Sequence, residues 1–204
     1  MLQGDFTRRL PRGPHDLPRA VVESSQRARL VEAMAACVAA SGYEAVTVAH
    51  VVAAAGVSRR TFYEHFAGKR ECFLAAYDTI DLLVDYVEER AREEGLEPRT
   101  RLEAGIRAYL ELMTAAPDFA RAFTIDVFAA GPEALERRAA VIERFAGLLL
   151  DVARDAGRDP APEVLVAVVG GINELVVDKL RQGAPGEVPG LAPAAIELAS
   201  AVCL

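Results

Sequence analysis

A tight turn at residues 55–57, between two short amphipathic segments, is the feature that most constrains the fold of this chain. Residues 48–55 place apolar side chains at steps of three and four, which predicts one face of a short helix. Thr47 stands where its side chain can cap the free N–H groups of that helix. Gly56 stands where the chain must leave it, a position that favours positive φ. Ser58 can then cap a second short helix, so we expect two helices held at a fixed angle by one turn.

The second helix, from residue 59, has a buried side and an exposed side. Phe62 and Phe66 lie four residues apart and should face the core. Tyr63 then faces outward, with Arg59 and Arg60 three or four residues before it on the same side. Two adjacent arginines in isolation are commonly a solvated pair, but nothing nearby in the sequence explains a basic helix start here. A short exposed helix with bidentate donors, beside hydroxyls that suit phosphates, is what reading the major groove of DNA requires.

These residues resemble the TetR family of transcriptional regulators. The resemblance covers residues 27–73 and rests on AGVSRRTFYEHF followed by GKRECF. It implies that the second helix enters the major groove and that Tyr63, His65 and Lys69 approach phosphates. Lys69 opens a helix, where a phosphate would offset the unfavourable position of a cation. The residues expected to contact DNA are Thr47, Ser58, Arg59, Arg60, Thr61, Tyr63, His65 and Lys69.

The charge of the chain is divided between a basic first third and an acidic remainder. Residues 1–70 contain ten Arg and Lys and six Asp and Glu, a net charge of +4. Residues 71–204 contain thirteen and twenty-four, a net charge of −11, which gives −7 for the whole chain. A basic end on an acidic body fits nucleic-acid binding by that end alone.

Several other classes of protein find no support in the sequence. No run approaches the roughly 18 apolar residues of a membrane span, and no signal segment is evident, so we expect a cytoplasmic protein without a membrane partner. The three cysteines, Cys37, Cys72 and Cys203, are far apart and odd in number. Core thiols in a reducing compartment fit best, with a redox switch or metal site as the alternative. No metal-ligand spacing or nucleophile–base pattern is present, so no metal, cofactor or enzymatic activity is expected.

The helical periodicity of the rest predicts an all-α chain of about nine helices, without strands or repeats. Residues 1–22 hold arginines among prolines and are read as a disordered basic segment or as an arm that contacts DNA. Residues 23–68 form the three-helix DNA-binding domain with its helix-turn-helix. Residues 69–204 form a helical domain for effector binding and dimerisation. Its first helix is predicted as one long element over 69–94, and the last helices over 163–181 and 191–202.

The helix predicted over 163–181 is apolar on nearly every side, and such a helix must be covered on every side. A second copy of the chain is the economical cover, and the resemblance implies the same two-fold, four-helix interface. The alternative is a core helix buried within one chain. The residues expected at the dimer interface are Val169, Gly170, Ile172, Val176, Ile196 and Val202.

We expect the effector-binding residues among the large or polar side chains on the helices of the acidic domain. Asn173 is the most distinctive, since an amide within an apolar helix needs a partner. That partner is a ligand, a backbone carbonyl or the other subunit, while ordinary core packing is the alternative for the whole set. The candidates are Tyr86, Tyr109, Met113, Phe123, Phe128, Phe145 and Asn173.

The sequence therefore predicts a dimeric repressor that binds a palindromic operator and is released by a small, mostly apolar ligand. In the resembling family, the ligand shifts the long helix after Lys69 and changes the separation of the two reading heads. A DNA-binding regulator or activator without an effector is the alternative, and an all-helical enzyme is a remote one.

Overall fold

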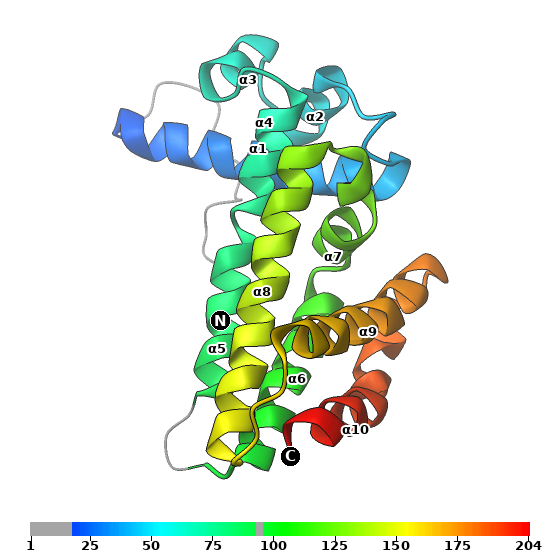
Figure 1. Ribbon diagram of the computed structural model, residues 1–204. Helices are drawn as coiled ribbons and strands as arrows, with labels where there is room; N and C mark the ends of the chain where they lie inside the picture. Colours follow the sequence, from blue (N-terminus) through cyan, green and yellow to red (C-terminus); the bar gives the residue numbers. More distant parts are fainter. Residues whose placement is uncertain (1–17, 93–95) are drawn as a thin grey trace.

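The computed structural model describes residues 18–92 and 96–204, and over these residues the chain is all-helical, as predicted (Figure 1). The helices lead from a head, formed by α1, α2 and α3, into a longer body formed by α4 to α10. The helices of the head are α1 (Arg19–Ser41), α2 (Val48–Ala55) and α3 (Arg59–His65). Those of the body are α4 (Lys69–Tyr77), α5 (Ile80–Ala91), α6 (Pro98–Ala115), α7 (Pro117–Thr124), α8 (Pro132–Asp155), α9 (Pro162–Arg181) and α10 (Ala192–Cys203), with the 3-10 helices η2 (Asp126–Ala129) and η3 (Pro185–Leu191).

The apolar periodicity of the sequence predicts the first helix over residues 25–40, and α1 begins six residues earlier, at Arg19. The carbonyl of Pro18 accepts hydrogen bonds from the N–H groups of Val21 (2.9 Å) and Val22 (3.3 Å), which starts the helix directly after the proline. Residues 19–22, predicted to belong to an unstructured segment, are therefore helical. Residues 1–17, which make up the rest of the predicted basic arm, lie outside the described residues.

The single helix predicted over residues 69–94 is divided into α4 and α5, which accounts for ten α-helices where about nine were expected. The break lies at Asp78 and Thr79. The hydroxyl of Thr79 donates to the carbonyl of Ala76 (2.7 Å), and so does its backbone N–H (3.2 Å). A threonine that bonds the preceding turn in this way competes with the helical ladder. The two helices nevertheless follow one another along the body (Figure 1).

Prolines set several of the remaining boundaries. Pro98, Pro117, Pro132 and Pro162 each occupy the first position of a helix, where the missing N–H costs no hydrogen bond. The 3-10 helix η3 was not predicted, because its Gly- and Pro-rich sequence has the composition of a loop.

An aromatic cluster joins the head to the body. The ring of Phe73 in α4 lies 5.0 Å from that of Tyr43 and 5.4 Å from that of Phe123 in α7. The ring of Phe123 also lies 4.9 Å from that of Tyr77. All four side chains are buried, within one core that extends from α1 to the start of α8. The head is therefore packed against α4 and α7 and is not joined to the body by a linker alone.

A second core fills the far part of the body, where α6, α9, η3 and α10 meet. Gly171 lets α9 and α10 approach closely, since a Cβ on it would lie 3.3 Å from Leu198 Cδ2.

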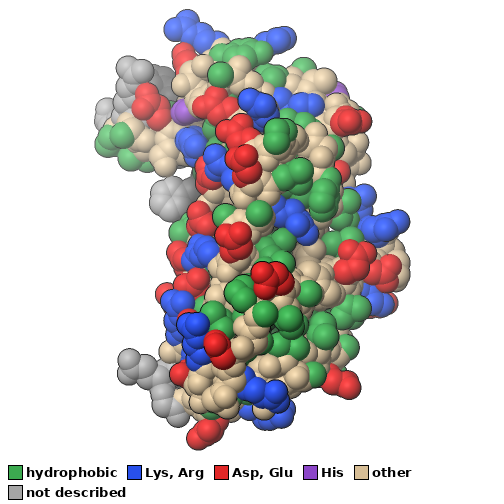
Figure 2. Space-filling model, viewed as in Figure 1, with side chains coloured by type: hydrophobic (Ala, Val, Ile, Leu, Met, Phe, Trp, Pro, Cys, Tyr) green, Lys and Arg blue, Asp and Glu red, His purple; other side chains and the backbone are tan. Residues whose placement is uncertain are grey.

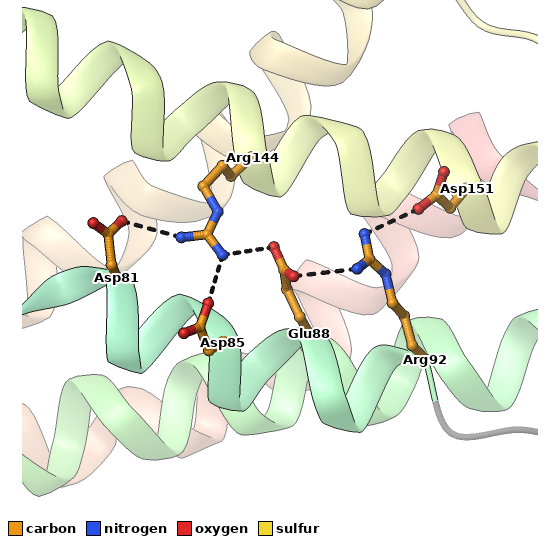
Figure 3. Close-up of polar contacts among 6 residues, drawn as sticks. All are labelled: Asp81, Asp85, Glu88, Arg92, Arg144 and Asp151. Atoms are coloured by element: carbon orange, nitrogen blue, oxygen red, sulfur yellow. Dashed lines mark hydrogen bonds and ion pairs between the residues drawn. The ribbon is translucent and has the colours of Figure 1, made fainter.

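Helix α5 is fastened to α8 by a network of ion pairs (Figure 3). Arg144 of α8 contacts Asp81 (3.0 Å), Asp85 (2.7 Å) and Glu88 (3.0 Å) of α5. Arg92, which follows α5, contacts Glu88 (3.2 Å) and, on α8, Asp151 (3.4 Å). The hydrogen bond that Arg144 donates to the carboxylate of Asp85 is the largest cause that raises the pKa of Arg144 above its ordinary value. The network holds the two helices parallel along the wall of the body.

The aromatic cluster gives a test of how the head is attached. Phe73→Ala is expected to lower the free energy of unfolding by about 3–5 kcal/mol, because it removes a fully buried ring and leaves a cavity. Leu82→Ala is the matched control, since that side chain is 63% exposed on α5 and its loss should change little. Urea unfolding followed by circular dichroism measures both. Equal effects of the two changes would contradict the packing described here.

Candidate nucleic-acid interface and effector cavity

The two-helix unit of the head is built as the sequence predicts. The hydroxyl of Thr47 accepts a hydrogen bond from the N–H of His50 (3.3 Å), and His50 Nδ1 accepts one from the N–H of Thr47 (3.4 Å). This reciprocal pair forms a capping box at the start of α2. Gly56 then adopts φ 63° and ψ 37°, the left-handed conformation that ends α2. The side chain of Ser58 accepts the N–H of Thr61 (2.9 Å) and caps α3.

Arg29 of α1 holds this turn in place, a role that the sequence did not reveal. Its Nε donates to the carbonyl of Ala55 (3.1 Å) and one of its terminal nitrogens to that of Gly56 (3.2 Å). These carbonyls end α2 and lack helical partners, so a cation there is favourable. The residues concerned are 26 and 27 positions apart, and no local pattern could have paired them.

Helix α3 divides its side chains between core and solvent as predicted. Phe62 and Phe66 are buried, and their ring centroids are 5.7 Å apart. Tyr63 is 48% exposed, and Arg59 donates to its hydroxyl at 3.4 Å. The guanidinium of Arg59 also lies 5.7 Å from the centroid of that ring. Arg59 and Tyr63 thus form one rigid, exposed unit on the outer side of α3.

Arg60 contacts Glu64 one turn later, at 3.0 Å, but its side chain is 89% exposed. Such an exposed pair contributes little free energy and releases its arginine readily to a stronger partner. Figure 2 shows Lys and Arg side chains projecting from the outer end of the head. The outer side of α3 therefore offers two arginines and a tyrosine hydroxyl to a duplex.

His65 and Lys69 both contact residues within the N-terminal part of the chain, at Gln26 and Tyr43. His65 Nε2 lies 3.5 Å from Gln26 Oε1 of α1. The ammonium of Lys69 donates to the carbonyl of Tyr43 (2.9 Å) and lies 4.3 Å from the centroid of its ring. A phosphate contact of Lys69 would therefore share an ammonium that also holds the loop before α2.

An elongated cavity of about 140 Å³ runs through the body between α5, α6, α7, α8 and α9. Its wall extends along α8 from Arg138 to Val152, a length of about 21 Å at the rise of an α-helix. Most lining side chains are aliphatic or aromatic. Five of the seven predicted effector-binding residues lie in this wall: Tyr109, Met113, Phe123, Phe145 and Asn173.

Tyr109 and Asn173 form the polar centre of the wall. The hydroxyl of Tyr109 donates to Asn173 Oδ1 at 3.1 Å, which identifies a protein partner for the amide that the sequence left open. Burial raises the pKa of Tyr109, so the phenol stays protonated and available for hydrogen bonding. The amide nitrogen of Asn173 has no hydrogen-bond partner among the described residues and can donate to a ligand.

The two other predicted effector-binding residues lie outside the wall. Phe128 is 60% exposed, because the short 3-10 helix η2 turns it away from the body, and the guanidinium of Arg138 lies 5.0 Å from its ring centroid. Tyr86 is partly buried and packs against the small cluster of Val87, Ala108 and Leu148, with the guanidinium of Arg90 5.3 Å from its ring centroid.

The predicted dimer residues divide into two groups. Ile172 and Val176 are buried in the chain's own core, because they lie on the side of α9 that faces α6. Val169, Gly170, Ile196 and Val202 are only partly buried. The apolar side chains that α9 and α10 leave exposed are instead Val164, Val166, Leu175 and Leu198.

Comparison with known proteins agrees with this architecture. Residues 30–76 match the family model described as bacterial regulatory proteins, tetR family. The N-terminal part of this chain is therefore similar to the N-terminal domain of TetR-family regulators. This match confirms the resemblance found in the sequence, and a helix-turn-helix followed by a helical body is the fold of TetR-family transcriptional regulators.

Solved structures extend the likeness to the body. The regulator FadR from Bacillus subtilis, in complex with stearoyl-CoA, superposes with a TM-score of 0.74 at 16% identity, covering 84% of this chain and 96% of that one. The fatty acid degradation regulator FadR from Bacillus halodurans gives 0.76 at 15% identity, covering 85% and 94%. A TetR-like regulator from Rhodococcus sp. RHA1 gives 0.68 at 22% identity, covering 90% and 96%. At these identities the likeness establishes the fold. No curated protein matches the chain in sequence.

Residues 18–92 and 96–204 hold no group of three or more His, Cys, Asp or Glu placed to bind a metal ion. Within the same residues, no helix has the length and apolar character needed to cross a membrane.

The arginines of α3 can be tested on a duplex selected from a random pool. Arg59→Ala or Arg60→Ala is expected to cost about 1–3 kcal/mol of binding where the arginine pairs with guanine, and to relax preference at that base. Lys69→Ala should instead weaken binding about equally on all sequences and lower the salt dependence by about one ion. Arg107→Ala, an exposed arginine of α6, is the control. Unchanged binding by both α3 variants in titrations by fluorescence anisotropy would show that α3 does not read the DNA.

Proposed function

We propose that this chain is a dimeric transcription repressor that leaves its operator when an elongated, mostly apolar effector fills the cavity of the body. The observation that carries the proposal is that one side chain belongs both to the cavity wall and to the aromatic cluster that joins the body to the head. Phe123 lines the cavity and also contacts Phe73 and Tyr77 of α4. Phe73 in turn contacts Tyr43, whose carbonyl holds Lys69 beside the DNA-reading unit.

This continuity gives a physical basis for release. A ligand that displaces Phe123 would also disturb α4 and α7, because the ring of Phe123 in α7 packs against Phe73 and Tyr77 of α4 in one buried core. Movement of α4 carries the head with it and alters the spacing of two heads in a dimer. Coupling needs only that the ligand bind the displaced state more tightly than the operator-binding state.

The shape of the cavity supports an extended effector. Pockets for small molecules are mostly apolar with a few placed polar groups, as here with Tyr109 and Asn173. The B. subtilis FadR structure contains stearoyl-CoA, a molecule with a long saturated chain. A long-chain acyl compound therefore fits both the length and the apolar character of this cavity.

Dimerisation is supported by the apolar side chains on α9 and α10 that nothing in the described chain covers. Val164 and Leu175 lie on one side of α9, three turns apart, and Leu198 of α10 packs beside Gly171 on the same side. Gly170 has no atom within 4 Å of a Cβ built on it, so another helix could approach α9 closely there. Two copies joined by this surface would bury it in a two-fold interface and place two α3 helices on one operator.

The interface has a direct test. Leu175→Glu and Leu198→Glu are expected to convert a dimer at micromolar concentration to a monomer and to abolish tight operator binding, because each buries a charge against apolar side chains. Leu82→Glu introduces the same charge at a more exposed leucine, on α5, and should leave the dimer intact. Sedimentation velocity measures all three. A wild-type chain that binds its operator tightly as a monomer would overturn the dimeric arrangement.

The effector function is tested by titrating a panel of long-chain acids, alcohols and CoA thioesters with and without operator. At least one compound should lower operator affinity by roughly 5–150-fold, which corresponds to a coupling of about 1–3 kcal/mol. Operator must weaken that compound by the same factor, because linkage is reciprocal. Phe123→Ala should bind the compound with reduced coupling. If no compound shows different affinity in the two titrations, the chain is an effector-independent regulator.

A further inference from the structure

The cavity wall contains a cation that no carboxylate neutralises. Among the described residues that line the cavity there is no Asp or Glu, and two arginines, Arg101 and Arg138. Arg101 is fully engaged, since its Nε donates to the carbonyl of Ala91 (2.7 Å) and its terminal nitrogen pairs with Asp155. Arg138 forms no ion pair or hydrogen bond with any described residue, and its guanidinium lies 5.0 Å from the ring centroid of Phe128.

The other arginines of α8 make this absence informative. Arg137 pairs with Asp78, Arg144 with three carboxylates of α5, and Arg154 with Asp159. Among the four arginines of α8, the half-buried Arg138 at the cavity is therefore the one that forms no ion pair with a described residue. A cation partly removed from water without a counterion is unfavourable, and a bound anion would relieve that cost.

The charge of Arg138 acts on the cavity itself. Burial raises the pKa of Tyr77 to about 12 and also raises that of Tyr109, and in both cases the nearby Arg138 opposes the rise. Both phenols belong to the cavity wall, Tyr77 at the end nearest the head. Asn173 and Arg138 thus place hydrogen-bond donors in the wall of the same cavity, whose other side chains are mostly apolar.

The outer face of the cavity wall, where α5 meets α8, carries more negative than positive charge. Along the seam of α5 and α8, the carboxylates Asp81, Asp85, Glu88 and Asp151 surround two guanidiniums, so the seam is negative overall (Figure 3). Both of its arginines are occupied, and a polyphosphate at this seam would meet an excess of carboxylates and no free cation.

We propose that the effector is a long-chain monocarboxylate and that Arg138 binds its carboxylate, with the apolar chain extending along the cavity toward Ala91 and Leu102. This inference rests on the proposed effector function and narrows its ligand. One unpaired guanidinium matches one carboxylate, with the bidentate geometry that arginine provides. The carboxylate would then lie at the head-proximal end, next to the aromatic cluster through which release is transmitted.

The test compares three ligands of equal chain length on the full-length protein: dodecanoate, dodecanol and dodecanoyl-CoA. Isothermal titration should show dodecanoate binding the wild type about 10- to 100-fold more tightly than dodecanol, the range for a hydrogen bond to a charged group. Dodecanoyl-CoA should bind more weakly than dodecanoate. In Arg138→Met the advantage of the acid over the alcohol should fall to within about two-fold, with the affinity for dodecanol unchanged.

Two further variants complete the design. Arg138→Lys keeps the charge and should retain part of the acid preference, so the inference stays testable if Arg138→Met does not fold. Arg107→Met removes an exposed arginine of α6 and should change none of the affinities. Circular dichroism establishes that each variant is folded.

The outcomes separate this inference from the function on which it rests. If dodecanol or dodecanoyl-CoA binds as tightly as dodecanoate and weakens operator binding, the repressor function stands and the carboxylate assignment is overturned. Retention of the full acid preference in Arg138→Met overturns the role of Arg138. Failure of all three ligands to bind the wild type overturns both proposals.

Discussion

The contact between Phe73 and Phe123 is the interaction on which the rest of the structure depends. It places a side chain of the cavity wall directly against the helix that leads out of the head. Both rings are buried in one continuous core, so the three helices of the head bury part of their apolar surface against α4 and α7. A head of this size could bury little surface alone. Its stability and the wall of the effector cavity therefore depend on the same side chains.

The body combines a rigid outer frame with a poorly filled interior. The ion pairs between α5 and α8 hold two parallel helices along the cavity (Figure 3). Well-packed cores leave few voids larger than a water molecule, whereas this one leaves about 140 Å³. Empty apolar volume lowers stability, and its persistence between fastened helices fits a space that a ligand fills.

Much of the DNA-reading unit could be predicted because its determinants are local. The cap at Thr47, the left-handed Gly56 and the exposure of Tyr63 depend on residues within one or two turns of each other. By contrast, the bonds of Arg29 to the end of α2 and of Lys69 to Tyr43 join residues some 26 positions apart. Hydrophobic periodicity contains no information about such pairings, so they were missed.

In the body, the sequence identified the helices but only part of the site. Periodicity and proline positions located α6, α8, α9 and α10 to within a residue, whereas the helix predicted over 118–129 ends at Thr124 as α7 and is followed by η2. Five of seven effector candidates reached the cavity wall. Phe128 failed to do so because η2 rotates it outward, and the Thr79 hydroxyl broke a helix that its apolar pattern would have continued. The sequence by itself determined the helical class, the exposed basic side of α3 and the basic first third of the chain, all properties of local spacing and composition. Only the tertiary structure decided which face of α9 is core, which tyrosine meets Asn173 and which arginine is left unpaired, because those depend on how distant helices are rotated against one another.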